Sequence, residues 1–222
     1  MLEIPCNMIC AGVSLSGKTV AFKGLYWPIC HRFRHTLLFS STNKLNGEYD
    51  DILANSRSSM FREHYDDELV KDIMRHQSST IEKLKNKYGS FANIPDKVKD
   101  KLHVSIITDD MLSLIDFHHS VFNELFTKSR HMCISIFIIQ QHINTISPAM
   151  RINAHYTLIT KIKDNNIDTL LDLIQMEDIG TSKNDLRRFL AKYCVNYQVI
   201  LFSERIVDKK NNKHYKIMKF NI

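Results

Sequence analysis

A glycine-rich segment near the N-terminus combines the residue types needed to hold a phosphate group. Its residues are Gly12, Val13, Ser14, Leu15, Ser16, Gly17, Lys18 and Thr19. They fit the Walker A spacing G-x-x-x-x-G-K-[ST] in full, in which the glycines allow a tight turn whose backbone N–H groups point at phosphate oxygens. In this pattern Lys18 places a cation on the β- and γ-phosphates, and the Thr19 hydroxyl ligates Mg²⁺. The sequence therefore predicts a P-loop that binds ATP with Mg²⁺, and a chance glycine turn is the alternative.

Two adjacent carboxylates, Asp109 and Asp110, follow an apolar run at residues 103–108. In a P-loop protein, the first acid at the end of such a strand holds Mg²⁺, often through water. The second acid of this Walker B pair can orient and deprotonate the attacking water. We expect Asp109 in the first role and Asp110 in the second. An Asp at the end of a strand can also cap the following helix, and this alternative stays open.

A second apolar run, residues 133–139, is framed by two polar side chains of interest. One class of P-loop NTPases inserts an additional strand between the P-loop strand and the acid strand, and a polar residue at its end faces the γ-phosphate. Gln140 is therefore a candidate sensor, and a solvent-exposed glutamine is the alternative. Arg130 stands just before the run. In ring ATPases such an arginine can reach a neighbour's γ-phosphate, although a solvated basic loop explains Arg130 almost as well.

The elements that position these residues alternate along the chain. Short apolar runs predict buried strands at residues 7–11, 36–40, 103–108, 133–139, 156–161 and 197–203. Longer periodic segments predict helices at residues 18–26, 66–88, 120–128, 167–175 and 183–193. Asn211 and Asn212 separate residues 204–208 from residues 214–220 and predict a C-terminal β-hairpin. This alternation is typical of an α/β fold, with a mainly parallel sheet flanked by helices.

Residues 43–100 interrupt the alternation, because they are polar and helix-rich and lie between the second and third predicted strands. Gly47, Gly89 and Pro95 punctuate this segment. We expect a helical insertion that packs on one face of the sheet, not a second domain. The whole chain, residues 1–222, is then a single P-loop ATPase domain, which its length of 222 residues permits.

The composition is that of an ordinary globular protein with a basic balance. The apolar share is 44% and the charged share 24%. The longest apolar runs are too short to span a bilayer, and the N-terminus has no basic and apolar regions of the kind found in a secretory signal. We therefore expect the protein to stay where it is made. A net charge of +6 suits a polyanionic partner, but many basic proteins bind no nucleic acid.

The five cysteines are scattered without a C-x-x-C pair. This spacing argues against a zinc ribbon or a disulfide framework and favours reduced, mostly buried thiols in a cytosolic compartment. Residues 30–35, with the sequence CHRFRH, match no common metal-site spacing. A solvated basic loop is the better interpretation of that segment.

The ordered set of motifs resembles a known family. The P-loop, the strand ending in Asp109 and Asp110, the segment 129–140 and the segment 146–154 look like the genome-packaging ATPases of large double-stranded DNA viruses and virophages. These are similar to the poxvirus packaging ATPase and belong to the wider FtsK–HerA group of DNA-pumping motors. The resemblance covers residues 4–203. Its most specific part is the Arg-His-x-x-Ile-Ser strand ending in Gln140, because many unrelated NTPases share a P-loop.

The resemblance implies an ATP-driven translocase that threads viral double-stranded DNA into a preformed capsid without reading the DNA sequence. It implies a homo-oligomeric ring that docks on a capsid vertex or portal component. It also implies action in the host cytoplasm, at the virus factory, with or without retention in the virion. No membrane span is expected.

The resemblance also assigns roles by position: Lys18 and Thr19 bind phosphate and Mg²⁺, the two aspartates form the acid pair, and Gln140 is the sensor. Two departures qualify this assignment. The wider motor group often carries Glu where this chain has Asp110. Arg130 and Arg151 both lie in matching segments, so the identity of the arginine finger stays open.

Two other classes of P-loop protein remain as alternatives. Nucleotide kinases have a similar size but usually carry an Arg-rich lid and an acceptor pocket, and the acid pair followed by a strand ending in Gln fits hydrolysis better. Partitioning ATPases, which are nucleotide-gated binding modules, carry an additional lysine near the start of the P-loop, and residues 13–15 contain none. DNA-stimulated release of phosphate without a nucleoside acceptor would separate a translocase from a kinase.

Overall fold

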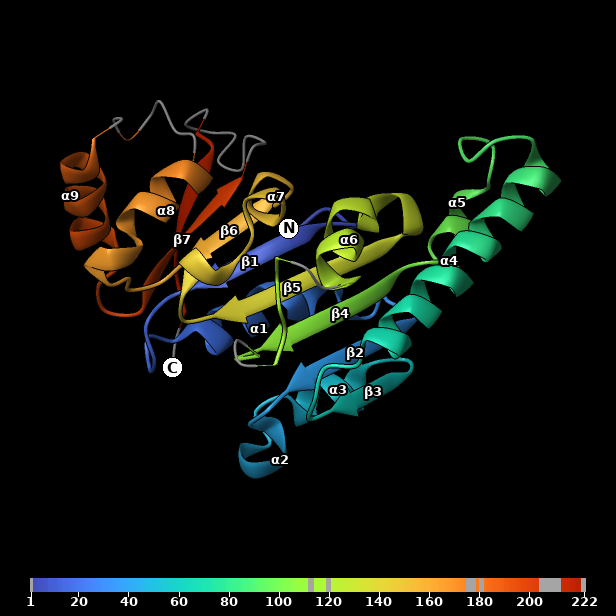
Figure 1. The fold of residues 1–222 in the computed structure, drawn as a ribbon, viewed down its shortest axis with the longest axis horizontal. Helices are drawn as coiled ribbons and strands as arrows, with labels where there is room; N and C mark the ends of the chain where they lie inside the picture. Colours follow the sequence, from blue (N-terminus) through green and yellow to red (C-terminus); the bar gives the residue numbers. More distant parts are fainter. Residues whose placement is uncertain are drawn as a thin grey trace.

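A mixed sheet organises the molecule in this computed structural model, which describes residues 2–111, 114–118, 121–174, 179, 182–203 and 213–220. Within these ranges eight strands pair in the order β3-β2-β4-β5-β1-β6-β7-β8 (Figure 1). The strands are β1 (Asn7–Ala11), β2 (His35–Ser40), β3 (Ser59–Arg62), β4 (Val104–Asp109), β5 (Ile134–Gln140), β6 (Tyr156–Ile159), β7 (Gln198–Ser203) and β8 (Tyr215–Lys219). Strands β1 to β6 run parallel, whereas β7 is antiparallel to both β6 and β8.

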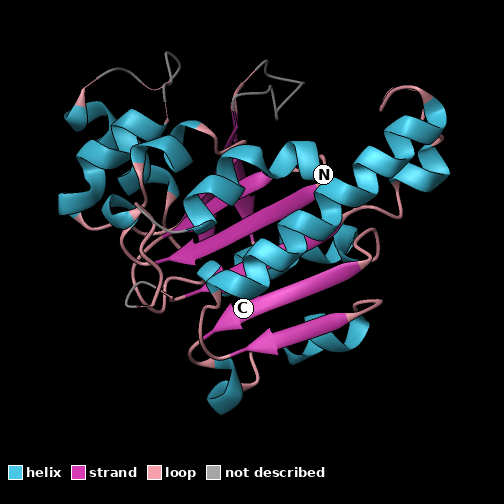
Figure 2. Ribbon diagram, turned by 45° about the vertical axis from the view of Figure 1, so that its right-hand side comes forward, coloured by secondary structure: helices cyan, strands magenta, loops and turns pink. Residues whose placement is uncertain are grey.

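Helices cover both faces of the sheet (Figure 2). The α-helices are α1 (Lys18–Cys30), α2 (Asn43–Asn46), α3 (Asp50–Asn55), α4 (Asp67–Tyr88), α5 (Asp96–Lys99), α6 (Val121–Lys128), α7 (Pro148–Ile152), α8 (Ile167–Leu173) and α9 (Lys183–Tyr193). Short 3-10 helices are η1 (Ser129–Met132), η2 (Ile143–Thr145) and η3 (Asp164–Asn166). Helices α1 and α3 pack into the core on one face, and α4, α6, α8 and α9 pack into the core on the other.

The central strands are apolar because they are buried on both faces. Side chains alternate across a strand, so Ile136 and Ile138 of β5 enter one core while Phe137 and Ile139 enter the other. Every residue of β4 and β5 is buried. Continuous apolar runs are typical of parallel strands in this situation, which explains why the sequence predicts these strands well.

Helix α1 is held firmly against the sheet directly after the P-loop. The rings of Phe22 and Tyr26 lie against the ring of Phe137, with centroids 5.4 and 5.3 Å away. The buried hydroxyl of Tyr26 shares a hydrogen bond of 2.7 Å with the Ser105 hydroxyl on β4. These contacts fix the start of α1 relative to the strands that carry the other candidate site residues.

The strand order confirms the predicted fold class. β5 lies between β1, which enters the P-loop, and β4, which carries the acid pair. This is the arrangement of the P-loop class with an additional strand.

The segment predicted as a helical insertion, residues 43–100, does contain helices α2 to α5. It also contains β3, a strand that the sequence pattern does not predict and that extends the sheet beside β2. β3 is a short edge strand of sequence SMFR and is largely exposed. It therefore lacks the apolar pattern by which buried strands are recognised.

A C-terminal β-hairpin is present, formed by β7 and β8. The first strand predicted for the hairpin, residues 204–208, lies outside the described residues. The second predicted strand, residues 214–220, overlaps β8.

Among the described residues no helix is long and apolar enough to cross a membrane. The five cysteines are free thiols: Cys6, Cys10, Cys30 and Cys133 are buried and Cys194 is half-buried.

Candidate active site

The carboxyl ends of the parallel strands β1, β2, β4 and β5 meet at one edge of the sheet, where open α/β sheets bind ligands. The loops at this edge surround a cavity of about 450 Å³. The residues that line it are Ser14, Leu15, Ser16, Gly17, Lys18, Thr19, Val20, Thr42, Glu48, Asp109, Asp110, Ile139, Gln140, Gln141 and Tyr197. The structure thus brings most of the predicted P-loop, both acids and Gln140 to one place.

The two glycines of the P-loop motif, Gly12 and Gly17, each have a geometric reason to be glycine. A Cβ atom on Gly12 would lie 1.7 Å from the Thr160 hydroxyl oxygen, so no side chain fits there. Gly17 has a φ of 82°, in the left-handed region that favours glycine. The loop is tied to its neighbours by backbone bonds, because Gly12 N donates to the Gln140 carbonyl (3.3 Å) and Val13 N to the Lys161 carbonyl (2.7 Å).

The Lys18 amine folds back onto its own loop and donates to the Val13 carbonyl at 2.8 Å. Burial lowers the pKa of Lys18, and the nearby carboxylates of Asp109 and Asp110 partly oppose this shift. Helix α1 begins at Lys18 without a side-chain cap. Its first N–H groups and the lysine are therefore suited to an anion that takes the place of the Val13 carbonyl.

Asp109 and Asp110 end β4 in different environments. Asp109 is 7% exposed, and burial raises its pKa to about 7. The Tyr49 hydroxyl opposes this rise in the pKa, although it makes no hydrogen bond of normal geometry among the described residues. Asp110 has a φ of 51°, its N–H donates to the Ile139 carbonyl (3.1 Å), and its Oδ2 accepts from Gln141 Nε2 (3.3 Å). Asp110 is thus oriented toward the cavity by bonds on both its main chain and its side chain.

The pKa of Asp109 leads to a stability prediction. An unfolded Asp ionises near pH 4, whereas folded Asp109 holds its proton up to about pH 7. Folding is therefore weakened as the pH rises toward 7, and the full penalty of a buried charge is present above that pH. Asp109→Asn should stabilise the nucleotide-free protein in EDTA. Its advantage should grow by about 2 kcal/mol between about pH 5.5 and about pH 8, measured by urea unfolding.

Asp96→Asn, on an exposed turn of α5, is the matched control for removing a carboxylate from the surface. An Asp109→Asn advantage that is equal at the two pH values would show that Asp109 ionises normally in the folded protein. A growing advantage would mean that the ionised form is kept at a cost in stability, as expected for a group that serves a cation.

Gln140 lies at the end of β5 and is completely buried. It lines the cavity, yet neither Oε1 nor Nε2 of its side chain has a hydrogen-bond partner among the described residues. Leaving a buried amide unpaired costs about 1–3 kcal/mol per group. Such an amide is well suited to a polar ligand, so its position agrees with the predicted sensor role and not with an exposed glutamine.

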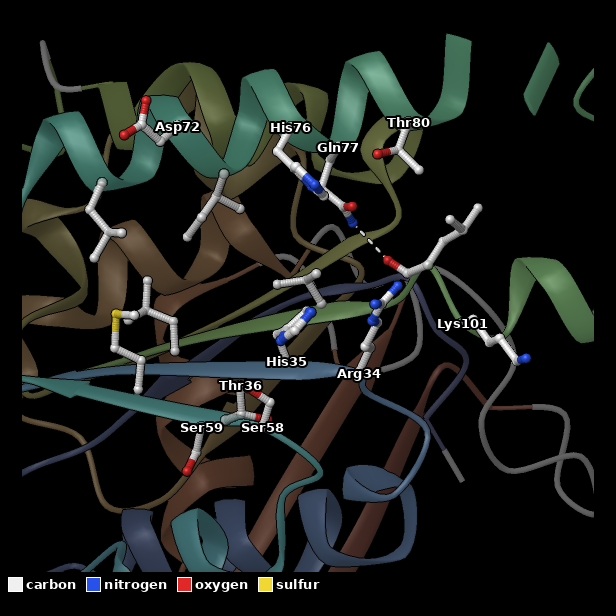
Figure 3. A pocket seen from close by; sticks show the side chains of 16 residues that line it. Arg34, His35, Thr36, Ser58, Ser59, Asp72, His76, Gln77, Thr80 and Lys101 are labelled. Carbon is white, nitrogen blue, oxygen red and sulfur yellow. Dashed lines mark hydrogen bonds between the residues drawn. The ribbon is translucent and has the colours of Figure 1, made fainter. Parts of the chain in front are cut away.

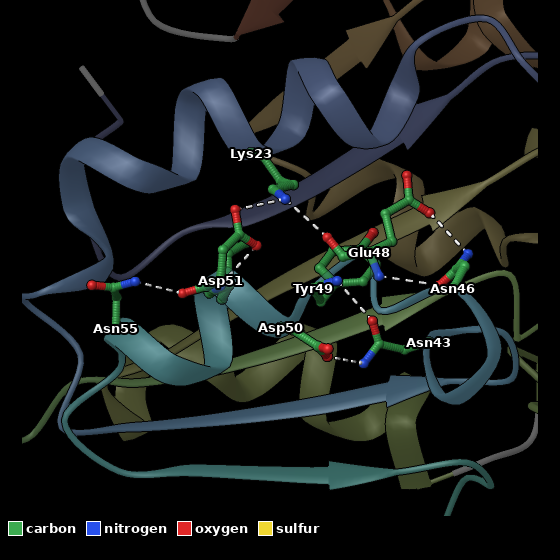
Figure 4. A network of polar contacts seen from close by, with 9 residues as sticks. Lys23, Asn43, Asn46, Glu48, Tyr49, Asp50, Asp51 and Asn55 are labelled. Atoms are coloured by element: carbon green, nitrogen blue, oxygen red, sulfur yellow. Dashed lines mark hydrogen bonds and ion pairs between the residues drawn. The ribbon is translucent and has the colours of Figure 1, made fainter.

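The segment that follows β2 contributes two residues that no sequence motif marks, Glu48 and Tyr49, which lie between α2 and α3. A network of polar contacts holds this loop at the cavity (Figure 4). Lys23 Nζ donates to the Glu48 carbonyl (2.9 Å), and Asn43 Oδ1 accepts from Tyr49 N (2.7 Å). The signal that could have found them is topological, since the loop after β2 must share an edge with Asp109 in a parallel sheet.

Arg130 and Arg151 lie away from this cavity. Arg130 is exposed in η1, which precedes β5 and therefore lies at the amino ends of the parallel strands. Arg151 is in α7, just before β6, and its Nη1 donates to the Ile146 carbonyl (3.2 Å). Among the described residues that line the cavity neither arginine occurs.

A second cavity, of about 320 Å³, lies between α4 and the amino-terminal part of β2 (Figure 3). Gln77 reaches across from α4 and donates to the Leu102 carbonyl at 2.7 Å. Basic side chains of Arg34, His35 and Lys101 contribute to the lining. The residues that line this cavity include none of the predicted site residues.

The donors at the first cavity fit magnesium. Mg²⁺ prefers oxygen ligands and usually keeps several waters while it is held by one or two protein groups and by substrate phosphates. The Thr19 hydroxyl and the Asp109 carboxylate line the same cavity and are oxygen donors of this kind. No group of three or more His, Cys, Asp or Glu residues gathers as a metal site in the described ranges.

The fold and the site together define a P-loop NTPase of the additional-strand class. The family model described as Poxvirus A32 protein matches residues 1–214, so the chain belongs to that family. The predicted resemblance to the poxvirus packaging ATPase is thus confirmed, and family membership supports an ATPase role in genome packaging. No curated protein sequence gives a significant match to the chain.

Several solved structures have a similar fold. The genome packaging NTPase B204 from Sulfolobus turreted icosahedral virus 2, in complex with ATP-gammaS, is 14% identical with a TM-score of 0.60, and the match covers 100% of each chain. B204 from Sulfolobus turreted icosahedral virus, a DNA-packaging ATPase, is 12% identical with a TM-score of 0.65 over 98% of each chain. The pCW3 conjugation coupling protein TcpA is 12% identical with a TM-score of 0.61, over 90% of this chain and 57% of its own. At these identities the likeness is one of fold.

Proposed function

We propose that this chain is a single ATPase domain, residues 1–222, that hydrolyses ATP with Mg²⁺ and uses the energy to move viral double-stranded DNA into a capsid. The observation that carries the proposal is the cavity at the carboxyl edge of the sheet. It gathers the P-loop, two adjacent carboxylates and an unpaired buried glutamine. Family membership supports the packaging role.

In this proposal Lys18 exchanges the Val13 carbonyl for the β- and γ-phosphates. The uncapped first turn of α1 adds backbone N–H groups to the same phosphates. Thr19 and Asp109 hold the metal ion, which when bound neutralises the charge that develops on the phosphate oxygens. Asp110, oriented by Gln141, accepts the proton of the attacking water.

Gln140 is proposed to sense the γ-phosphate. The side-chain amide of Gln140 can pair with a phosphate oxygen or with the attacking water. The main-chain carbonyl of Gln140 already accepts a hydrogen bond from Gly12 N in the P-loop. The next residue, Gln141, contacts Asp110. Loss of the γ-phosphate would therefore change the contacts of Gln140 at the end of β5. This end of the strand contacts both the P-loop and the acid pair.

We propose further that the protein works as a homo-oligomeric ring. Arg130 is placed at the edge of the sheet opposite its own cavity, so it can serve a γ-phosphate only across a subunit boundary. The proposed partners are double-stranded DNA and a component of the capsid vertex or portal. The proposed place of action is the host cytoplasm, at the virus factory.

Measurements of DNA binding test whether double-stranded DNA is a partner of this protein. A motor that grips the DNA backbone gains its affinity by releasing counterions, so affinity should be insensitive to sequence and should fall steeply with salt. For about 6–10 phosphate contacts, we expect a loss of about 10³–10⁵-fold between about 50 mM and about 200 mM salt. Fluorescence anisotropy with two unrelated duplexes would measure both properties.

Lys18→Ala without nucleotide is the matched control, because it should bind DNA as the parent does if the DNA and nucleotide sites are separate. An affinity that does not change with salt, or a strong preference for one of the two duplexes, would count against a translocase.

A further inference from the structure

A second hollow adjoins the candidate active site and shares one wall with it. It has a volume of about 380 Å³. Its lining consists of Val13, Ser14, Leu15, Ser16, Lys161, Cys194, Asn196, Tyr197 and Gln198. Ser14, Leu15, Ser16 and Tyr197 also line the larger cavity. The two spaces therefore meet across the P-loop, one on the side of the acid pair and the other on the side of β6 and β7.

Two exposed apolar side chains stand at the boundary between these spaces. Leu15, at the tip of the P-loop, is 97% exposed, and Tyr197, in the turn between α9 and β7, is 55% exposed. Figure 1 shows that this turn and the end of β1 lie at the same end of the sheet. An aromatic ring and an aliphatic side chain on the rim of a phosphate-binding loop present flat apolar surface to whatever is attached to the phosphates.

The backbone presents Tyr197 in an unusual conformation. Asn196 and Tyr197 have φ values of 50° and 60°, both in the left-handed region. Asparagine tolerates this region, whereas a bulky aromatic residue rarely adopts it. The turn is closed by a hydrogen bond from Gln198 N to the Val195 carbonyl (2.9 Å). Strained backbone of this kind is found mainly where it positions a group for function.

From this arrangement we propose that the hollow is the nucleobase subsite, and that the base of the nucleotide stacks on the ring of Tyr197. This inference rests on the proposed function, because it places the base next to phosphates held in the P-loop. Leu15 covers the base from the P-loop side. The side-chain amides of Asn196 and Gln198 can donate to and accept from the polar edge of a purine.

A thermodynamic cycle with two ligands separates the base from the phosphates. ATP carries both parts, whereas inorganic tripolyphosphate carries only the part that the P-loop holds. Alanine substitution of an aromatic residue that stacks on a base weakens binding by about tenfold or more. Tyr197→Ala should therefore lower the affinity for ATP by about tenfold and leave the affinity for tripolyphosphate unchanged. Tyr197→Phe, which keeps the ring, should retain the affinity for ATP. Calorimetry with the purified full chain in Mg²⁺ measures all of these values.

Each outcome decides the inference. Equal loss of ATP and tripolyphosphate binding in Tyr197→Ala would mean that the tyrosine shapes the P-loop and does not carry the base. Unchanged ATP binding in Tyr197→Ala would overturn the stacking directly. A parent protein that binds neither ligand would refute the proposed function, and the subsite with it. Leu15→Ser provides a second variant that leaves the α9–β7 turn intact, and it should show the same selective loss of ATP binding to a smaller degree.

Discussion

Lys18→Ala should abolish ATP hydrolysis and leave the protein folded. The half-buried Lys18 lies beside its own loop and its amine donates to the Val13 carbonyl, so it does not support the packing of the core. Loss of a preorganised charge that stabilises a transition state lowers the rate by about 10²–10³-fold, and more where it also binds the substrate. The release of phosphate measures the rate, and thermal unfolding verifies the fold. Lys71→Ala, on the exposed side of α4, is the matched control and should retain full activity.

A second variant, Asp110→Asn, separates ATP binding from ATP hydrolysis. It should bind ATP almost as the parent does and fail to hydrolyse it, because the change removes the proton acceptor and keeps the shape of the side chain. Hydrolysis near the parent rate would instead make Asp110 a structural residue. Glu48, which lines the same cavity, would then be the next candidate for the base. Retained hydrolysis in a folded Lys18→Ala protein would refute the proposed active site itself.

Mixing two inactive variants should restore part of the activity. Arg130 lies at the far edge of the sheet from its own cavity, so we expect it to act on the nucleotide of a neighbouring subunit. Arginine fingers raise the rate by about 10³–10⁵-fold, so Arg130→Ala should be almost inactive. In a ring that mixes Arg130→Ala with Lys18→Ala, some interfaces pair an intact P-loop with an intact arginine. Phosphate release by the mixture should exceed that of either variant alone.

The same mixture distinguishes the alternatives. If the arginine and the P-loop act within one chain, every subunit stays defective and mixing restores nothing. A strictly sequential ring could also stay silent, so Arg130→Ala should be diluted into the parent protein as well. Inhibition beyond the fraction of variant subunits supports action between subunits, whereas a proportional loss contradicts it. Arg151→Ala, mixed in the same way, tests the other arginine at that edge of the sheet.

The parts of the fold that follow from local pattern could be predicted from the sequence. The bounds of β1 and α9 match the prediction, because a buried parallel strand and an amphipathic helix have distinct apolar periods. Edge strand β3 was missed because its residues are mostly exposed. Asn211 and Asn212 predict a C-terminal hairpin, but the local pattern does not show that β7 is the strand that pairs with β8, because that pairing depends on contacts between strands.

The residues of the candidate site also fall into those that the sequence could predict and those that it could not. The P-loop residues, Asp109 and Gln140 could be located because a motif or a strand end marks them. Glu48, Tyr49 and Tyr197 could not, because their positions depend on where the loops after β2 and before β7 lie relative to β1. The polar network around Lys23 and Asn43, which fixes the first of these loops, joins residues with no shared motif.

Phosphate release by the assembled protein, with and without double-stranded DNA, is the most direct test of the account. We predict that duplex DNA of arbitrary sequence raises the ATPase rate of the parent protein and that Lys18→Ala stays inactive under both conditions. An ATPase rate that is unchanged at saturating DNA would contradict the proposal that hydrolysis in this site drives the movement of DNA.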